Sequence, residues 1–500
     1  MIMRDAEGER SLKKVLGATD LILLGIGAII GAGIFTTVGT AAVGDGARPG
    51  AGPALVLSFL LTAIACAFTA LCYAEFAAMV PISGSAYTYS YATLGELVAW
   101  IIGWDLIIEY AVGNVAVAIS WADYFKVLLE GFGIHIPSWL STNYGVVFHV
   151  VNPELTAKVL AEAPRIPIGP LAGLFPSEWN VTSDFPVIIN LPAAAIVLLV
   201  TVVLVIGIRE SATFNAVMVG IKILVLLFFI VVGAFYVKPE NWQPFAPNGF
   251  RGIAAGAAII FFAYIGFDAV STVAEETKNP KRDMPIGILG SLIICTIFYM
   301  IVTAVLTGMI PYKELAANTA EPLAAALKYH GLDVAAGLVA AGSVITLTAV
   351  LLVFQLGQPR IFFAMSRDGL LPPVFARVHP KYRTPHVTTI ATGILVAVTA
   401  AFSSLESMVE LTNIGTLFAF ILVCVGVMVL RIKDPERPRP FKVPGGAFLV
   451  PSLGVITCVA LIYYLPPASW TRFALWLLLG MLVFFLYGYK HSVLNKSVKE

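Results

Sequence analysis

The sequence predicts an all-α polytopic membrane protein, and three observations support this fold class. First, 59% of the 500 residues are hydrophobic and only 12% are charged, whereas soluble domains carry roughly a quarter charged residues. Second, twelve mostly apolar stretches approach or exceed the ~20 residues that a helix needs to cross a bilayer. Third, these stretches are continuous rather than alternating, which excludes barrel strands because backbone groups in lipid must be paired within a helix or a closed barrel.

The twelve predicted spans follow one another along the whole chain. Their approximate bounds are 18–43, 53–80, 96–127, 186–208, 212–237, 252–275, 285–310, 334–364, 386–403, 408–431, 449–466 and 470–489. The longest polar connection, residues 128–185, follows the third span. A helical pattern at residues 321–329 predicts a short helix between the seventh and eighth spans.

The distribution of Lys and Arg predicts how the chain is oriented in the membrane. If the N-terminus is cytoplasmic, 21 of the 31 Lys and Arg residues fall in inner segments, 9 fall in outer ones, and Lys222 lies within the fifth span. Because Lys and Arg concentrate on the cytoplasmic side of membrane proteins, we expect both termini in the cytoplasm. The protein is then a multi-pass protein of the plasma membrane, with the connection at residues 128–185 outside the cell.

Glycines in the middle of the first span indicate a helix that is not continuous. Gly25, Gly27, Gly31 and Gly33 lie there, although each glycine costs a helix about 1 kcal/mol relative to alanine. One explanation is close packing of helices through small residues. The other, which we favour, is an unwound stretch at residues 30–33. Its free N–H groups, at the positive end of a half-helix, could hold a carboxylate, and its freed carbonyl groups could hold an ammonium group.

The sixth span has a similar interruption, because residues 261–268 combine Gly266 with Asp268 at membrane depth. Two broken helices at corresponding places in two halves indicate an inverted repeat with a substrate site near the bilayer midplane. We therefore expect spans one to five (18–237) and six to ten (238–431) to be the repeats. The two peripheral spans (432–490) follow them, and the cytoplasmic tails comprise residues 1–17 and 491–500.

Lys222 is the basic residue in the middle of the fifth span. A lysine at the centre of a span costs at least a few kcal/mol on insertion scales. The side chain could reach the membrane surface, but it lies some ten residues from either end of the helix. We therefore favour an amine that faces the interior of the bundle and that gains and loses a proton. Such a charge can replace a bound sodium ion, so the coupling ion is expected to be H⁺.

Several other polar residues lie within predicted spans. Glu109 and Asp105 are four residues apart in the third span and share one helix face. For these acids and Glu75 of the second span, hydrogen bonding between helices is as good an explanation as proton coupling or binding of a cationic side chain. Ser343 and Thr346 in the eighth span could offer hydroxyl groups to the ion site, although helix–helix hydrogen bonding explains them equally well.

The sequence contains no motif typical of an enzyme, a metal-binding protein or a nucleic-acid-binding protein. No Ser/His/Asp set lies at one depth, and no phosphate-binding loop or HExxH motif occurs, so we do not expect an enzyme. No His or Cys residues have metal-ligand spacing, so neither a metal nor another cofactor is expected. The net charge of +1 gives no indication of nucleic acid binding.

The motifs in these spans resemble those of the amino acid–polyamine–organocation (APC) superfamily. Residues 27–35 resemble its first-helix signature, and residues 261–268 resemble its sixth helix. Residues 360–372 resemble the stretch that ends its eighth helix. Residues 410–417 resemble the tenth helix of the cationic amino acid transporter (CAT) branch, as it occurs in bacterial members. The resemblance extends from about residue 11 to residue 490.

This resemblance implies a LeuT-type fold, in which five plus five helices form the inverted repeat, two helices are peripheral, and helices 1 and 6 are broken. Carried over to this sequence, the substrate carboxylate is bound by the backbone of Ile30, Gly31, Ala32 and Gly33. The amino group is bound by carbonyl groups of Phe262, Ala263 and Ile265, with Phe262 at the position of an aromatic gate. Lys222 takes the place that a sodium ion fills in other members.

The function expected from these observations is proton-coupled symport of L-amino acids by alternating access in a lipid membrane. Small neutral substrates are favoured, because the site signature offers no pocket carboxylate beyond Asp268 and Glu109. A carrier of cationic amino acids and an amino acid exchanger are the first alternatives. A channel and an amino acid sensor without transport activity are alternatives from other classes.

Overall fold

The computed structural model describes residues 15–79, 87, 90–91, 95–144, 153–167, 184–207, 212–382 and 384–493. Residues 1–14 and 494–500 of the predicted tails lie outside this described part. So do residues 145–152 and 168–183 of the predicted outer connection.

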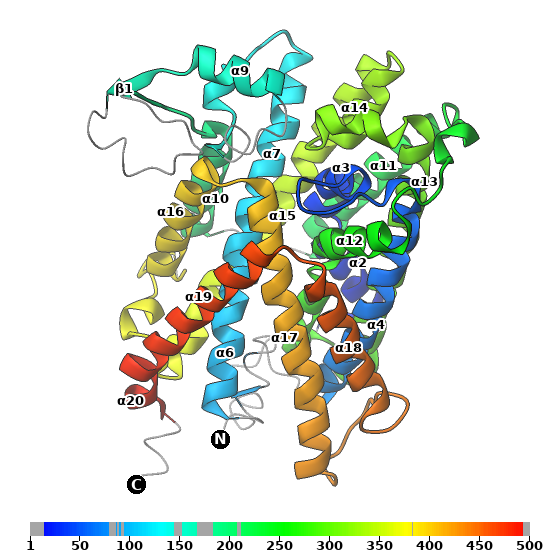
Figure 1. Ribbon diagram of the computed structural model, residues 1–500. Coiled ribbons are helices and arrows are strands. Elements are labelled where there is room, and N and C mark those ends of the chain that lie inside the picture. Colours follow the sequence, from blue (N-terminus) through cyan, green and yellow to red (C-terminus); the bar gives the residue numbers. More distant parts are fainter. Residues whose placement is uncertain are drawn as a thin grey trace.

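Each predicted span of the first half contains apolar helix in the structure (Figure 1). The first span comprises α2 (Ala18–Ile29), η1 (Gly33–Thr37) and α3 (Val38–Val43). The second comprises η2 (Gly52–Ala54) and α4 (Leu55–Met79), and the third comprises α6 (Glu96–Ile107), η3 (Ile108–Val112) and α7 (Gly113–Glu130). The fourth and fifth are α10 (Leu191–Ile206) and α11 (Ala212–Ala234).

Each predicted span of the second half also contains apolar helix. Its first span comprises α12 (Gly249–Ile260), η8 (Phe261–Tyr264) and η9 (Phe267–Glu276). The next four are α13 (Pro280–Met309), α15 (Asp333–Arg367), α16 (His386–Phe402) and α17 (Leu405–Lys433). The last two are α18 (Leu449–Tyr463) and the continuous run of α19 (Pro467–Val483), η12 (Phe484–Gly488) and α20 (Tyr489–His491).

Short elements cap the end of the bundle that the charge distribution predicts to be the outer one, at the top of Figure 1. They include the predicted short helix, which is confirmed as α14 (Pro322–Tyr329) and is preceded by η10 (Tyr312–Asn318). The long connection contributes η4 (Ser138–Leu140), α9 (Pro153–Glu162) and an antiparallel pair of strands, β1 (Arg165–Pro167) and β2 (Asp184–Pro186). The one-turn helix η7 (Pro239–Trp242) also lies at this end, whereas η11 (Pro373–Ala376) lies in the connection between α15 and α16, on the predicted inner side.

The chain is therefore an all-α polytopic membrane protein. Within the described residues, eight helical stretches are each long and apolar enough to cross a bilayer, and the bent pair Ala18–Ile29 and Gly33–Val43 is a ninth. Three shorter apolar helices, α10, α16 and α18, occupy the remaining predicted spans. The total of twelve crossings stays a prediction.

The surface of the bundle is apolar where the fold class requires contact with lipid. Large aliphatic side chains are more than half exposed on α10, α11, α16 and α19, as at Leu199, Leu224, Leu395 and Leu478. Polar side chains are instead turned inward, and Lys222 is only 1% exposed. Burying a charged group is tolerable only where it finds partners, so the inward-facing polar residues indicate where the site lies.

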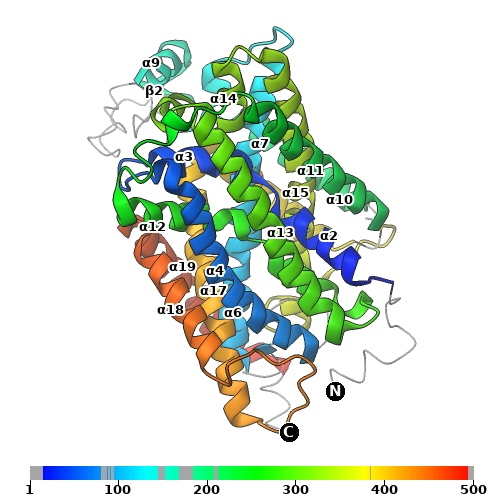
Figure 2. The ribbon, with the colours of Figure 1, turned by 90° about the vertical axis from the view of Figure 1, so that its right-hand side faces the viewer.

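Helices from the two halves pack against each other in corresponding pairs. The second span (α4) packs along the seventh (α13), the third (α7) along the eighth (α15), and the fourth (α10) along the ninth (α16); Figure 2 shows α4 and α13 side by side. A two-fold axis that relates the halves would bring such pairs together. This arrangement agrees with the inverted repeat, which itself stays a prediction.

A buried ion pair at the opposite end of the bundle ties α4 to α17. Glu75, which is 0% exposed, accepts hydrogen bonds from Arg431 Nε at 2.9 Å and from the Val443 backbone N–H at 2.8 Å. Arg431 Nη2 bonds its other oxygen, and Arg439 Nε lies 3.5 Å from Oε1. These contacts assign Glu75 to holding the α17–α18 connection in place.

Glu75→Gln should therefore lower the stability of the folded protein strongly. Removing one partner of a buried ion pair leaves the other charge uncompensated and costs roughly 3–5 kcal/mol. The matched control is Glu130→Gln, because Glu130 and Lys328 form an exposed pair at 3.5 Å that is worth only about 0–1 kcal/mol. Thermal unfolding of both purified variants measures the difference. Equal melting temperatures would show that the Glu75 pair contributes nothing.

Candidate functional site

The first span is broken where the glycines predict a break. α2 ends at Ile29, and Ile30 leaves the helical region with φ −72° and ψ 104°. The chain becomes helical again at Gly33, and the two helical segments are bent by 43° relative to each other. Within the described residues, the backbone N–H groups of Gly31 and Ala32 form no hydrogen bond with a backbone carbonyl group in the turns, loops and helix caps. The break therefore leaves two backbone N–H groups outside the hydrogen bonding of the helix.

The sixth span is broken as well. α12 gives way to the 3₁₀ turn Phe261–Tyr264, Ile265 is extended with ψ 134°, and helical structure resumes at Phe267. Gly266 has a φ of +115°, which is the region that favours glycine. A Cβ atom at Gly266 would also lie 2.9 Å from the backbone of Ala28. Only glycine satisfies both requirements at this position.

The two breaks lie against each other. A Cβ atom on Gly33 would lie 2.2 Å from Cα of Ala263, so the two backbones approach each other more closely than any side chain would allow. The Oη atom of Tyr299 on α13 lies 2.8 Å from the Ile29 carbonyl oxygen and 3.0 Å from that of Ala263. Its single proton is shared between two carbonyl groups that no longer have helical partners. Tyr299 thus links the breaks.

Lys222 is placed directly behind the first break. Its Nζ atom donates hydrogen bonds to the carbonyl oxygens of Gly27 at 2.5 Å and Ile30 at 3.1 Å. Within the described residues, no carboxylate lies within ion-pair distance of Lys222. The ammonium group therefore rests on carbonyl groups at the end of α2 and at the break.

The two hydroxyl residues predicted for the ion site lie on α15, which packs against both α11 and α2. Val350, one turn after Thr346, would lie 3.1 Å from a Cβ atom at Gly31, so this part of α15 borders the break. Ser343 Oγ donates to Val339 O in its own helix at 2.8 Å. Thr346 Oγ1 is buried without a hydrogen-bond partner in the described part of the chain. The structure records no hydrogen bond from either hydroxyl to Lys222.

Three buried acids, Glu109, Asp268 and Asp105, lie near the start of η9, directly after the break of the sixth span. Glu109, on the π-helical turn η3, interacts electrostatically with both Asp268 and Asp105. Neither Glu109 nor Asp268 forms an ion pair with any described basic residue. Two neighbouring carboxyl groups of this kind can share a proton or receive a cationic group.

Two residues that sequence reasoning did not select also support the breaks. Tyr299 is the first of them. Asn413 on α17 is the second, because its Nδ2 atom donates to the carbonyl groups of Ala258 at 2.8 Å and Ile259 at 3.1 Å, just before the 3₁₀ turn. A signal was present in both cases: a hydrogen-bonding side chain within an apolar span needs a partner when it is buried.

Tyr299→Phe should destabilise the meeting point of the breaks. The change removes only the hydroxyl group and leaves the Ile29 and Ala263 carbonyl groups without a donor, at a cost of about 1–3 kcal/mol for an unsatisfied buried group. The measurement is the melting temperature of the purified variant. Tyr329→Phe on the exposed side of α14 is the control, because its side chain is 54% exposed. An unchanged melting temperature for Tyr299→Phe would contradict the bridging role.

Comparison with known proteins identifies the family of this site. The model of the family described as amino acid permease matches residues 16–486, which include both breaks and Lys222. The chain belongs to the amino acid permease family. This confirms the resemblance to the APC superfamily, and the members of the family that the chain matches are transporters.

Individual relatives of the permease cover nearly its whole length. It is 48% identical to the branched-chain amino acid permease BcaP of Bacillus subtilis over 98% of this chain and 96% of that protein. It is 46% identical to the methylthioribose transporter of the same organism over 97% and 96% of the two chains. It is 37% identical to human cationic amino acid transporter 4 over 90% of this chain and 64% of the human protein. The permease is therefore similar to carriers of chemically different solutes.

Proposed function

We propose that this permease carries small neutral L-amino acids together with protons, by alternating access, across the plasma membrane with both termini in the cytoplasm. The observation that carries this proposal is the meeting of two broken helices with a buried lysine on the carbonyl groups of one of them. Family membership and the branched-chain amino acid permease of Bacillus subtilis support an aliphatic amino acid as substrate.

The proposed substrate site consists of backbone atoms. The backbone of Ile30, Gly31, Ala32 and Gly33 holds the α-carboxylate, because the start of a helical segment carries partial positive charge. The N–H groups of Gly31 and Ala32 are the donors, since that of Ile30 donates to the Ile26 carbonyl oxygen at 2.9 Å. The carbonyl groups of Phe262, Ala263 and Ile265 hold the α-ammonium group. Such a site recognises what all amino acids share, and the space beside the Phe262 ring determines which side chain is accepted.

The proposed coupling group is Lys222. In its charged form it satisfies the carbonyl groups of Gly27 and Ile30, and loss of the proton removes the charge that stabilises these dipoles. The bend of the first span is then coupled to protonation. Ser343 and Thr346 on the neighbouring α15 belong to this proposed ion site, and the Glu109–Asp268 pair is a second place where a proton can be held.

Burial at the breaks favours a carrier over a channel. Ile30, Ala32, Phe262, Ala263 and Ile265 are between 0% and 6% exposed. A conducting pore would leave such residues in contact with water along a continuous path. Enclosure of the site in this conformation is what alternating access requires of an intermediate between the outward-open and inward-open forms.

Two observations favour other substrates. The Glu109–Asp268 pair could accept a cationic side chain, as the 37% identity to a cationic amino acid transporter allows. The methylthioribose transporter relative points to a neutral sugar derivative, which has neither a carboxylate nor an ammonium group for the two breaks. These alternatives predict different ligands for the same protein.

A thermal-shift screen followed by uptake measurements tests the proposal. The purified permease is heated with each of the twenty amino acids, methylthioribose and common polyamines, because ligands that bind the folded state raise its melting temperature. Uptake of the best ligand into proteoliposomes is then compared with and without an imposed pH gradient. Stabilisation by alanine or valine and acceleration by an acidic outside are expected. Uptake that does not respond to the gradient would refute proton coupling, and stabilisation by methylthioribose alone would refute the amino acid site.

A further inference from the structure

We propose that the permease binds an anionic phospholipid of the inner leaflet at the connection between α15 and α16. This connection comprises residues 368–385 and lies at the end of the bundle that the charge distribution predicts to be cytoplasmic. Arg377 and Lys381 supply positive charge there, and the exposed faces of α10 and α16 supply an apolar wall. The inference goes beyond the proposed function, because it concerns a lipid rather than the transported solute.

Hydrogen bonds within the connection fix the turn that carries Lys381. The Nδ1 atom of His379 accepts hydrogen bonds from the backbone N–H groups of Lys381 and Tyr382, each at 3.1 Å. The His379 backbone N–H donates to the Thr384 carbonyl oxygen at 2.8 Å. Thr384 Oγ1 in turn donates to the Val205 carbonyl oxygen of α10 at 2.8 Å. The turn is therefore held against the predicted inner end of α10.

The short helix η11 fixes the position of Arg377. The ring of Phe375 packs against that of Phe362 on α15, with 5.6 Å between their centroids, and Arg377 directly follows the last residue of η11. Val374 and Val378, which flank Arg377 in the sequence, are exposed. Exposed apolar side chains beside a basic residue are typical of segments that lie in the interface between lipid headgroups and acyl chains. The connection is therefore suited to that layer of the membrane.

The charges of Arg377 and Lys381 have no carboxylate partner. Both residues are exposed, and within the described residues neither forms an ion pair. The connection has one acidic residue, Asp368, and this residue is engaged elsewhere. It accepts a hydrogen bond from Tyr87 Oη at 2.8 Å and lies 3.7 Å from Arg367 Nε. The positive charge of the connection is therefore left for an anion from outside the chain.

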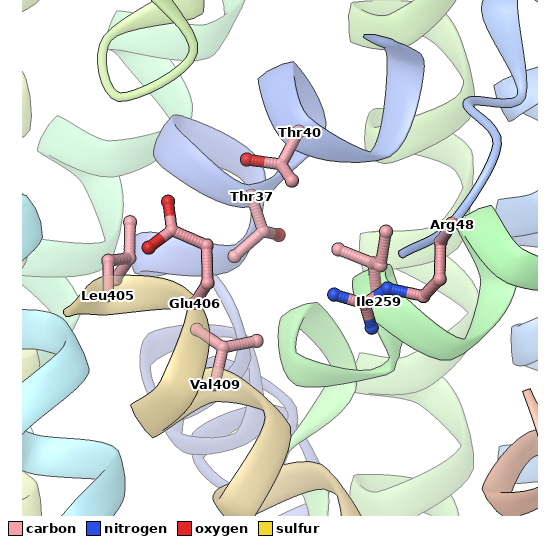
Figure 3. Close-up of a pocket in the computed structure, with 7 residues that line it drawn as sticks. All are labelled: Thr37, Thr40, Arg48, Ile259, Leu405, Glu406 and Val409. Carbon is pink, nitrogen blue, oxygen red and sulfur yellow. The ribbon is translucent and has the colours of Figure 1, made fainter. Parts of the chain in front are cut away.

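Basic residues in other connections have the partners that Arg377 and Lys381 lack. Arg48, which lines a small pocket at the opposite end of the bundle (Figure 3), is paired with Asp45 at 2.6 Å and with Glu410 at 2.8 Å. Arg437, in the connection after α17, has Asp434 at 3.9 Å. In the connection between α15 and α16, the phosphate of a lipid headgroup can take the place of such a carboxylate, because basic residues at the cytoplasmic surface attract anionic lipids.

The apolar wall beside the connection favours a lipid over a soluble phosphate. α10 and α16 pack side by side (Figure 1), and the connection joins the start of α16 to the end of α10 through Thr384. The nearest large side chains on the outside of these helices are between 41% and 59% exposed: Val202, Ile206, Ile390 and Ile394. Acyl chains can cover this wall while the headgroup contacts the basic residues. A soluble phosphate would use the basic residues alone.

The charge balance of the connection selects lipids whose headgroup is negative overall. A phosphatidylcholine headgroup carries a cationic amine beside its phosphate, and the connection has only Asp368, which is already engaged, to receive it. Phosphatidylglycerol has the same phosphate and an uncharged glycerol. The N-terminus of α16, which begins at His386 in the same place, adds partial positive charge. We therefore expect phosphatidylglycerol to bind in preference to phosphatidylcholine.

Lipid-dependent thermal unfolding tests this inference. Permease purified in a neutral detergent is heated with increasing amounts of phosphatidylglycerol or phosphatidylcholine, because a ligand that binds the folded state raises its melting temperature. We expect phosphatidylglycerol to stabilise the wild type. The double variant Arg377→Gln/Lys381→Gln should need roughly 30-fold more of this lipid for the same rise, since each basic side chain near an anionic surface contributes about a factor of five. Either single variant, which serves if the double variant does not fold, should need roughly fivefold more.

The matched control is the double variant Lys158→Gln/Lys313→Gln. It removes the same charge from two exposed residues on the predicted outer side, which form no ion pair among the described residues. Its response to phosphatidylglycerol should equal that of the wild type. An equal loss of response in both double variants would show a general effect of charge and would overturn the site.

Three further outcomes would overturn the inference. The first is an unchanged response of Arg377→Gln/Lys381→Gln to phosphatidylglycerol, because the basic residues would then not hold the lipid. The second is equal stabilisation by phosphatidylcholine, which would remove the selection by charge. The third is equal stabilisation by inorganic phosphate, which would show that the ligand is a soluble anion. None of these measurements involves transport, so each outcome leaves the proposed function untouched.

Discussion

Replacing Lys222 with methionine should abolish amino acid uptake driven by a pH gradient. Methionine keeps much of the side-chain length but has no charge and no proton to release. The carbonyl groups of Gly27 and Ile30 then lose their donor, at a cost of about 1–3 kcal/mol for each unsatisfied group. The measurement is uptake of labelled amino acid into proteoliposomes whose outside is acidic, together with the melting temperature of the purified variant.

Two controls distinguish the coupling role of Lys222 from a structural one. Lys222→Arg keeps a permanent positive charge that is not released, so it should also lose the response to the pH gradient. Lys238→Met, outside the predicted spans, should transport as the wild type does. Uptake by Lys222→Met that accelerates in an acidic outside medium as much as wild-type uptake would rule out the proposed proton role.

Replacing Gly33 with valine should abolish binding at the breaks. A Cβ atom at this position would lie 2.2 Å from Ala263 Cα and 2.8 Å from Ala263 N. Because these are backbone atoms, they cannot turn aside as the end of a side chain can, and the two broken helices must separate. Overpacking of this kind costs about 1–3 kcal/mol, and separation displaces both the N–H groups and the carbonyl groups proposed to hold the substrate. Equilibrium binding and the melting temperature are the measurements.

Other glycines of the same bundle serve as matched controls. At Gly31 an added Cβ atom would meet only the Val350 side chain, at 3.1 Å, so Gly31→Ala should weaken binding less than Gly33→Ala. At Gly220 nothing lies within 4 Å of the added atom, and Gly220→Ala should be neutral or stabilising by up to about 1 kcal/mol. Wild-type affinity in Gly33→Val would contradict the placement of the site at the breaks.

The helix breaks were predictable from sequence because their causes are local. Glycine lowers the stability of a helix wherever it lies, and α2 does end at Ile29, with η1 beginning at Gly33. The break at Gly266 likewise follows from the residue itself, whose φ of +115° is costly for other residues. The roles of Ile30, Gly33 and their neighbours in binding are a separate matter, and they stay predictions.

The partners of the buried polar residues were not predictable in the same way. Glu75 and Lys222 were conspicuous because each is a charged residue in an apolar span. The partner of Glu75 is 356 residues away, at Arg431, and Lys222 bonds a carbonyl group 195 residues away, at Gly27. Tyr299 joins Ile29 across 270 residues. No local pattern encodes such pairings, because they depend on which helices pack together and at what height.

The sequence by itself determined where the chain is apolar enough to enter a membrane, where two of its helices lose their regular form, and to which family it belongs. Each of these follows from the composition or the local order of residues. Only the tertiary structure decided that the two breaks touch, that Lys222 rests on the first of them, and that Tyr299 links the two. These depend on contacts between distant segments, which are fixed by the packing of the whole bundle.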